Sequence, residues 1–144
     1  MENPFDFPWV RMINPQVDEI AVGRLVLAHE PGELHLNHNG DINAAVLFSL
    51  AEMAGMGVVV TTLGVQAAGA YVVIKRGAIN FTARARGRIR AAARLEATQL
   101  ERVRSAGSEV AGIEEMVAVE IRDASDRVVA CCEVTTVIRP RRRC

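Results

Sequence analysis

The segment from Asn43 to Leu63 constrains the fold most, because it is apolar along its whole length and carries one charged side chain, Glu52. Apolar residues occupy every face of the helix that this segment can form. We therefore predict a helix buried in the middle of the fold, with Asp41 or Asn43 as its N-cap. An ionised carboxylate in such surroundings is costly unless another group pairs with it, solvates it or uses it. Glu52 is thus the residue that an account of function has to explain.

After this helix the chain alternates between polar and apolar residues, as a half-buried strand does. We predict strands at residues 71–84 and 84–98, the second because its arginines fall on one parity. A final hairpin of strands 116–123 and 128–139 follows, turning at Ala124-Ser-Asp126. One apolar helix followed by long strands predicts an α+β fold, in which a long antiparallel sheet wraps around one central buried helix.

The residues before the helix predict two shorter strands and an arm. Strands are expected at residues 19–27 and 33–38, with a turn at Pro31-Gly32 between them. Residues 1–16 combine three prolines with aromatic side chains. This composition predicts a short helix or irregular arm that packs on one end of the core.

Length and charge limit what the chain can do. A chain of 144 residues with 50% hydrophobic content can bury a core, and we predict one domain over residues 1–144 with a basic tail at 140–144. The formal net charge of zero offers no general attraction to nucleic acid or to a membrane surface. The apolar helix is long enough to span a bilayer, but Glu52 would then lie near the bilayer centre. We therefore expect neither nucleic acid nor a membrane as a partner.

The cysteines and the N-terminus predict a cytoplasmic protein. Cys131 and Cys132 are adjacent and Cys144 ends the sequence, so these residues suggest no disulfide framework. Thiols of this kind are typical of a reducing compartment. The first residues lack the basic and apolar regions of a secretory signal.

A short motif around the start of the helix resembles that of a known family. The segment NHNGDINAA at residues 37–45, followed by LAE at 50–52, resembles the signature of hotdog-fold acyl-CoA thioesterases of the phenylacetate-pathway type. In that signature Asn-x-x-Gly-x-x-His-Gly-Gly precedes Leu-Ala-Asp or Leu-Ala-Glu at fixed spacing. Residues 79–83 and 126–130 are similar to later segments of the family, and the resemblance covers roughly residues 17–139.

The resemblance implies a fold, an activity and a set of site residues. It implies a hotdog fold and hydrolysis of acyl-CoA thioesters, with no metal and no cofactor. The backbone N–H of Ala44 would hold the oxyanion, Glu52 would act as general base or nucleophile, and Asn37 would hold the water or the thioester. Further residues implied in substrate binding are Gly40, Asn43, Ala45, Phe48 and Phe81.

Two departures from the family motif stand at the start of the helix. Asn43 replaces the family's histidine, and it can cap a helix but cannot titrate. Ala44 and Ala45 replace a pair of glycines; they keep their backbone N–H groups but narrow the approach for a ligand. These changes are similar to those in a divergent branch of the superfamily.

The spacing of Ala44 and Glu52 makes a separate demand. Eight residues of α-helix rise about 12 Å, so these two groups of one chain cannot easily meet at a single carbonyl. A homodimer with antiparallel helices solves this, because each site then takes Ala44 from one subunit and Glu52 from the other. We therefore predict a homodimer and leave open its association into a dimer of dimers.

Several alternatives remain from the sequence. Glu52 can be a structural carboxylate, and the chain can be a non-catalytic acyl-CoA-binding protein. A hydroxyacyl dehydratase fits less well, because that class uses a histidine where Asn43 stands. We give His35 and His38 only a small chance of a catalytic role. The basic segment 139–143 can meet the phosphates of coenzyme A or a nucleic acid, but we favour a solvated tail.

Overall fold

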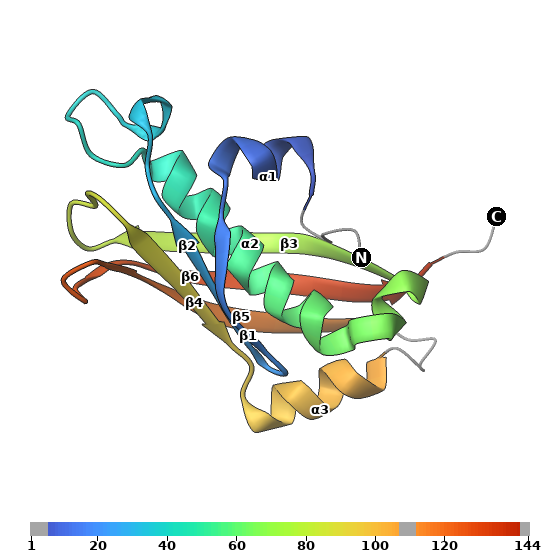
Figure 1. The fold of residues 1–144 in the computed structure, drawn as a ribbon. Coiled ribbons are helices and arrows are strands. Elements are labelled where there is room, and N and C mark those ends of the chain that lie inside the picture. The colour runs from blue at the N-terminus through green and yellow to red at the C-terminus, as the bar shows by residue number, and fades with distance from the viewer. Residues whose placement is uncertain (1–5, 107–111, 142–144) are drawn as a thin grey trace.

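The computed structural model describes residues 6–106 and 112–141, and within them one sheet wraps around a long helix (Figure 1). The sheet has six antiparallel strands in the order β1-β2-β4-β5-β6-β3. The strands are β1 (Gln16–Ala21), β2 (Arg24–His29), β3 (Ala70–Phe81), β4 (Ile89–Arg94), β5 (Ile113–Asp123) and β6 (Val128–Pro140). The helices are α1 (Pro8–Ile13), α2 (Ala44–Leu63) and α3 (Ala97–Ala106), with 3-10 turns η1 (Glu33–His35) and η2 (Gly64–Gly69). The prediction of an α+β sheet around one central helix is confirmed.

Helix α2 begins and ends where its sequence directs. The Asn43 side chain accepts a hydrogen bond from the Ala45 N–H at 2.9 Å, which confirms Asn43 as the N-cap. Gly64 ends the helix with φ +58°, a positive backbone angle that glycine adopts without steric cost. In mid-helix, a Cβ on Gly55 would lie 3.0 Å from the Cβ of Val134 on β6. A glycine at this position therefore lets the helix lie close against the sheet.

One stripe of α2 is only partly covered by the described residues. Its members are spaced by four residues and are half-buried, in contrast to the buried residues on the other faces of the helix: Phe48, Glu52, Met56 and Val60. The helix is therefore surrounded on most sides, but not on all of them. Glu52 lies in the middle of this half-buried stripe.

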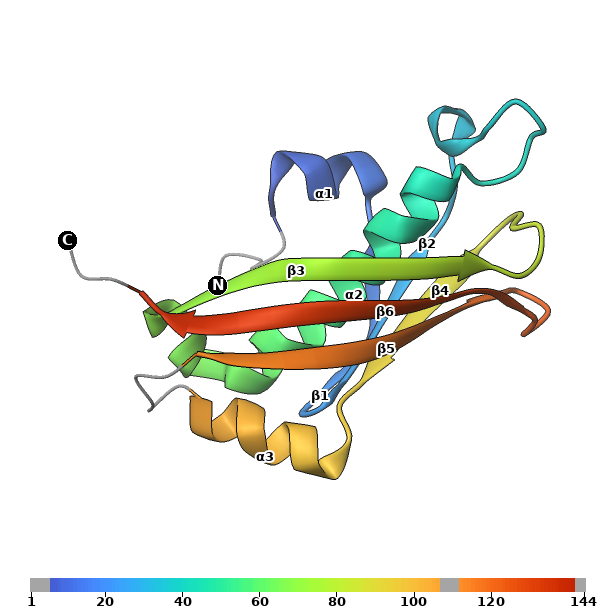
Figure 2. The same ribbon diagram turned by 180° about the vertical axis from the view of Figure 1, so that it is seen from behind.

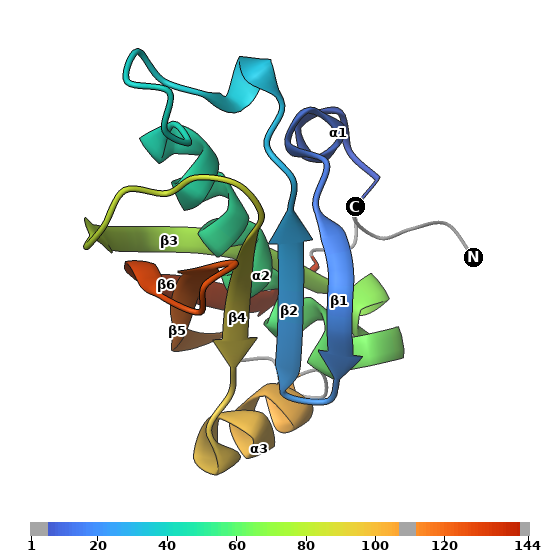
Figure 3. The same ribbon diagram turned by 60° about the vertical axis from the view of Figure 1, so that its left-hand side comes forward.

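The apolarity of α2 is explained by its place in the core. Among the described residues, only the stretch Ala44–Gly69 is long and apolar enough to cross a membrane. The fold buries 61% of its most apolar window, as expected for the core helix of a soluble protein. Figure 3 shows this helix behind β4, β2 and β1.

Three predicted elements were wrong in detail. The strand predicted at 19–27 is interrupted by a turn at Val22-Gly23, where Gly23 has φ +77°. The segment therefore covers the end of β1 and the start of β2. The strand predicted at 33–38 is the 3-10 turn η1, followed by an isolated bridge from Leu36 to Ile42. The strand predicted at 84–98 shrinks to β4, because Gly87 (φ +69°) turns the chain before it and α3 starts after it.

The strand predicted at 71–84 is β3, which ends at Phe81, and the predicted final hairpin is confirmed. The final hairpin joins β5 and β6 across the predicted turn, where Asp126 has φ +66°. The predicted N-terminal arm contains α1 from Pro8, while residues 1–5 of that arm lie outside the described part. The predicted basic tail starts inside β6, and residues 142–144 also lie outside the described part.

Candidate active site

A hollow of about 380 Å³ opens at the N-terminal end of α2. It is formed where the loop before the helix meets the end of β3 and the loop that follows β3. Its lining residues are Asn37, Asp41, Ile42, Ala44, Leu47, Phe81, Thr82, Ala83, Arg84 and Ala85. The hollow thus brings together three residues that the sequence singled out: Asn37, Ala44 and Phe81.

Ala44 offers an unused hydrogen-bond donor to this hollow. As the first residue of α2 its N–H has no partner within the helix. The next N–H, of Ala45, is taken by the Asn43 side chain, and the Val46 N–H is bonded to the Asn43 carbonyl. Among the described residues nothing accepts the Ala44 N–H. This donor lies at the positive end of the helix dipole and is available to a ligand.

Asn37 is held in place by the loop that it shapes. Its side-chain oxygen accepts from the N–H groups of Asn39 at 2.8 Å and Asp41 at 3.2 Å. Gly40 closes this turn with φ +75° and donates its N–H to the Asn37 carbonyl. Because the oxygen is occupied, the side-chain amide NH₂ is the part of Asn37 that remains for a ligand.

His35 also holds the loop before α2 in place. Its Nδ1 accepts from the Gly32 N–H at 2.9 Å, and its Nε2 lies 2.7 Å from the carbonyl oxygen of Met12, at the end of α1. The ring also meets the buried His29 edge-on, with centroids 4.6 Å apart. Both ring nitrogens of His35 are engaged in holding the loop, so this histidine has a structural task.

Asp41 joins the loop before α2 to the loop after β3. Its carboxylate is largely buried and accepts from Arg84 Nε at 2.9 Å and from Arg86 Nε at 2.6 Å. Hydrogen bonds from Arg86 and Arg84 hold the pKa of Asp41 below its ordinary value of 3.8. Two arginines face one carboxylate here, so the mouth of the hollow keeps an excess positive charge.

Replacing Asp41 by asparagine is expected to lower the melting temperature at neutral pH, because both arginines lose their partner. Since the pKa of Asp41 is lower in the folded than in the unfolded protein, its stabilisation is full above the unfolded value of about 3.8. It is lost as the pH falls through the folded value. The melting temperatures of the wild type and Asp41→Asn should therefore converge in acid. A constant difference at every pH would contradict this account.

Glu52 lies in the third turn of α2 and does not line the hollow. Its carboxylate is half-buried and makes no hydrogen bond or ion pair with the described residues. Burial raises the pKa of Glu52 above its ordinary value of 4.5. Helix geometry separates it from Ala44 by about 12 Å of rise. A single chain therefore brings Asn37 and Ala44 together at the hollow but leaves Glu52 outside it.

The remaining predicted residues have different surroundings. Asn43 and Ala45 are exposed, and both take part in the helix cap. Phe48 is half-buried and packs so closely under β3 that a Cβ on Gly77 would lie 2.5 Å from its Cζ. Phe81 is 50% exposed at the end of β3 and forms one wall of the hollow.

An apolar hollow of about 250 Å³ lies farther along α2, past Glu52. It is enclosed by α1, α2 and β3, and Met53, Met56, Gly57 and Val72 contribute to its lining. Met53 and Met56 therefore line this apolar hollow, whereas Phe48 and Phe81 do not.

Sequence reasoning missed the residues of the loop after β3. Arg84 and Arg86 were assigned to the outer face of a strand, but they lie in a loop and bind Asp41. Gly87 was the available signal, since a glycine inside an alternating pattern indicates a break. No group of three metal-binding side chains occurs in the part of the chain that the structure describes.

Comparison with known proteins finds a family and a set of similar structures. A family model described as "Domain of unknown function (DUF4442)" matches residues 4–138. A probable thioesterase of unknown function from Pseudomonas aeruginosa is 25% identical, with a TM-score of 0.80 over 94% of this chain and 89% of that chain. The comparison with curated proteins finds no match.

Two further structures share the fold at lower identity. Thioesterase HI1161 from Haemophilus influenzae is 14% identical, with a TM-score of 0.74 over 94% of this chain and 85% of that chain. The PaaI protein of the phenylacetic acid degradation operon of Escherichia coli is 15% identical, with a TM-score of 0.71 over 91% of this chain and 83% of that chain. The hotdog fold expected from the motif at residues 37–52 is thereby confirmed.

Proposed function

We propose, from the premise that this chain belongs to the DUF4442 family and has the hotdog fold, that it hydrolyses acyl-CoA thioesters in the cytoplasm. The similar structures named as thioesterases support thioester hydrolysis as the class of reaction. The observation that carries the proposal is the free N–H of Ala44 at the start of α2, a residue that lines the hollow together with Asn37 and Phe81. A developing oxyanion needs such a donor.

The second part of the proposal is a homodimer in which Glu52 reaches the site of the other subunit. Strand β3 lies at the edge of the sheet beside β6, and no described strand pairs with the other side of its 12 residues (Figure 2). A long open edge of this kind invites pairing with a second strand. Antiparallel pairing of two β3 edges about a twofold axis would bring the two α2 helices side by side in opposite directions. The half-buried stripe of α2 containing Glu52 would then face the partner.

In this dimer the reaction follows from the properties of three groups. Ala44 N–H polarises the thioester carbonyl and stabilises the negative charge that forms on its oxygen. The Glu52 carboxylate from the other subunit takes a proton from water, whose oxygen attacks the carbonyl carbon. The carbon–sulfur bond then breaks, and the proton held on Glu52 passes to the departing sulfur. The products are a carboxylic acid and a thiol.

The raised pKa of Glu52 suits this role. A carboxylate that binds a proton more readily than usual is a better general base. Glu52 can instead attack the carbonyl directly and form an anhydride that water opens. Single-turnover reaction in ¹⁸O-labelled water separates the two routes, because only the anhydride route can leave label in the Glu52 carboxylate.

A non-catalytic acyl-CoA-binding protein is the second candidate. It is favoured by the departures at Asn43, Ala44 and Ala45, since two methyl groups narrow the approach to the helix start. A hydroxyacyl dehydratase is less favoured, because Asn43 cannot titrate.

Release of free thiol from a panel of acyl-CoA substrates tests the proposal. We expect turnover of at least one acyl-CoA by the wild type and its loss in Glu52→Ala. Absence of release with every acyl chain, together with measurable acyl-CoA binding, would favour the binding protein. Equal release by the variant would rule out Glu52 as the base.

A further inference from the structure

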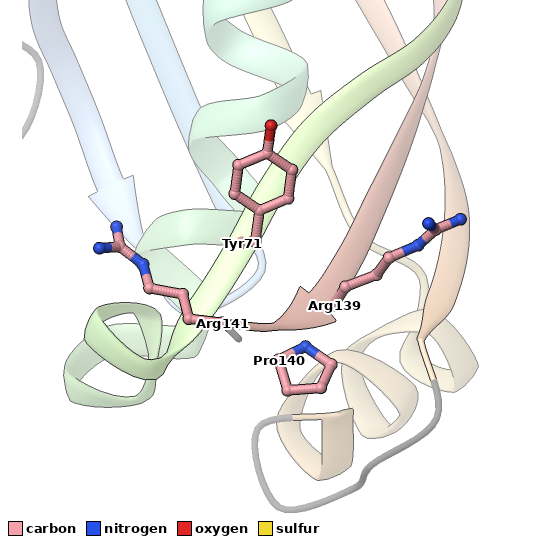
Figure 4. Close-up of a pocket in the computed structure, with 4 residues that line it drawn as sticks. All are labelled: Tyr71, Arg139, Pro140 and Arg141. Carbon is pink, nitrogen blue, oxygen red and sulfur yellow. The ribbon is translucent and has the colours of Figure 1, made fainter. Parts of the chain in front are cut away.

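A hollow of about 570 Å³ lies at the opposite end of β3 from the candidate active site. Four residues line it: Tyr71, Arg139, Pro140 and Arg141 (Figure 4). Tyr71 is the second residue of β3 and lies opposite Arg139 of β6 in the sheet. The figure shows the tyrosine ring between two arginine side chains that extend to opposite sides of it.

The backbone of this hollow is well fixed although its side chains are exposed. Arg141 N–H donates to the Gly69 carbonyl at 3.0 Å, and Arg141 Nε donates to the Ala70 carbonyl at 3.1 Å. Tyr71 is 57% exposed, so its side chain is accessible to a ligand. Arg141 still has its terminal Nη groups available, because Nε alone is used by the fold.

The arginines of this patch have no carboxylate partner, in contrast to most arginines of the described residues. Nine arginines elsewhere pair with carboxylates: Arg11, Arg24, Arg84, Arg86, Arg88, Arg90, Arg102, Arg122 and Arg127. Within residues 6–106 and 112–141, Arg139 and Arg141 have no carboxylate within salt-bridge distance. Two guanidinium groups without a carboxylate partner, beside an exposed aromatic ring, form a surface that suits an anion attached to a flat ring.

We propose that this hollow binds a phosphorylated adenine nucleotide, with Arg139 and Arg141 on the phosphates and Tyr71 stacked on the base. Guanidinium groups bind phosphate oxygens in a bidentate manner, which favours arginine over lysine at such sites. An aromatic ring offers a stacking surface to a base. The nucleotide is that of coenzyme A, and this part of the inference rests on the proposed thioesterase function.

The dimer geometry places this hollow beside the active site of the other subunit. If the two β3 edges pair around their middle, Lys75 faces the partner's Arg76 and Tyr71 faces the partner's Asn80. If the centre is shifted so that Gly77 faces the partner's Ala78, Tyr71 faces the partner's Arg84. Over this whole range Tyr71 lies beside the end of the partner's β3, which forms a wall of the partner's active-site hollow.

A ligand can therefore extend from one site to the other. The thioester would lie at the start of α2 of one subunit, and the nucleotide would lie on Tyr71 and the two arginines of the other. Glu52 and the nucleotide hollow would be supplied to each active site by the same subunit. The basic segment that we interpreted as a solvated tail thus contributes two of its arginines to the binding of substrate.

Titration with ADP tests this inference without any hydrolysis. ADP carries the base and a pyrophosphate but no acyl chain. We expect the double variant Arg139→Ala/Arg141→Ala to weaken ADP binding about tenfold or more, as loss of charged hydrogen bonds does. Arg94→Ala, an exposed arginine at the end of β4, is the matched control. Arg139→Lys/Arg141→Lys keeps the charge and should retain part of the affinity, and melting temperatures verify that each variant is folded.

Two comparisons separate the parts of the proposed ligand. Tyr71→Ala should weaken ADP binding but leave inorganic pyrophosphate binding nearly unchanged, because only the base is stacked. For an acyl-CoA and the matching acyl-N-acetylcysteamine thioester, the ratio of kcat/KM values should fall about tenfold in the double arginine variant. The second substrate lacks the nucleotide, so a general loss of activity would leave the ratio unchanged.

The outcomes are distinguishable from failure of the proposed function. Normal hydrolysis with no effect of the arginine variants on ADP binding or on the kcat/KM ratio would overturn the nucleotide site alone. ADP binding that depends on both arginines, without hydrolysis of any thioester, would support the nucleotide site and overturn the thioesterase. Arginine-dependent binding of a single-stranded oligonucleotide in preference to ADP would also overturn the inference.

Discussion

Glu52→Gln is expected to lower kcat for thioester hydrolysis by about 10²–10⁴-fold, the usual contribution of a positioned general base. Glutamine has nearly the same shape as glutamate but cannot take a proton from water. KM should change little, because Glu52 acts on the water and not on the bound acyl-CoA. Steady-state kinetics with the substrate that gives the highest rate checks this. Glu101→Gln, which changes an exposed carboxylate on α3, is the matched control.

The pH dependence gives a second readout of the same residue. A general base must be ionised, so kcat/KM should fall as the pH drops through the raised pKa of Glu52. This acid limb should lie above 4.5, the ordinary value for the side chain. The residual activity of Glu52→Gln should lack that limb. An identical profile in the two proteins would show that another group titrates.

Glu52→Gln should raise the stability of the protein although it lowers the activity. Because burial raises the pKa of Glu52 in the folded protein, the folded state holds the proton more tightly than the unfolded state. The stability of the wild type therefore falls as the pH rises from 4.5 through the folded pKa. Glu52→Gln removes this penalty, so we expect a higher melting temperature at neutral pH and little difference in acid. A destabilised variant would favour a structural carboxylate with a partner in the dimer.

Ala44→Pro is expected to lower kcat by about 10²–10³-fold, the cost of losing one oxyanion donor. Proline has no N–H, and the first helical position tolerates it because that N–H is unused by the helix. The preceding Asn43 has φ −59° and ψ 138°, which is compatible with a following proline. Ala44→Ser keeps the N–H and is the control. Equal loss in both variants would point to side-chain crowding instead of the missing donor.

Mixing the two inactive proteins tests whether the site spans two subunits. A mixed dimer of Ala44→Pro with Glu52→Gln has one site with an intact Ala44 and an intact Glu52. Random exchange of subunits should restore about a quarter of wild-type activity, since half of the dimers are mixed and each has one intact site. No recovery after verified subunit exchange would show that both groups act within one chain.

Local patterns in the sequence were sufficient for the central elements of the fold. The apolar run ending at Gly64 predicted α2 with Asp41 or Asn43 as its N-cap, because helix formation and capping depend on neighbouring residues, and the cap is Asn43. Alternation over residues 116–139 predicted the β5–β6 hairpin in the same way. Where two patterns overlapped, as at 84–98, alternation was extended across Gly87 and into α3. The alternation of polar and apolar residues does not by itself show where a strand begins or ends.

The sequence by itself determined that a single carboxylate, Glu52, lies in the apolar helix, and the spacing of Ala44 from it set their separation along the helix. Only the tertiary structure decided which residues surround the start of that helix. Asp41 meets Arg84 and Arg86 across more than forty residues of chain, and Tyr71 meets Arg139 through the pairing of β3 with β6. Such contacts follow from how strands are ordered in the sheet, which depends on interactions between residues far apart in sequence. A helix fixes distances along its own axis, whereas a binding site depends on distances between elements.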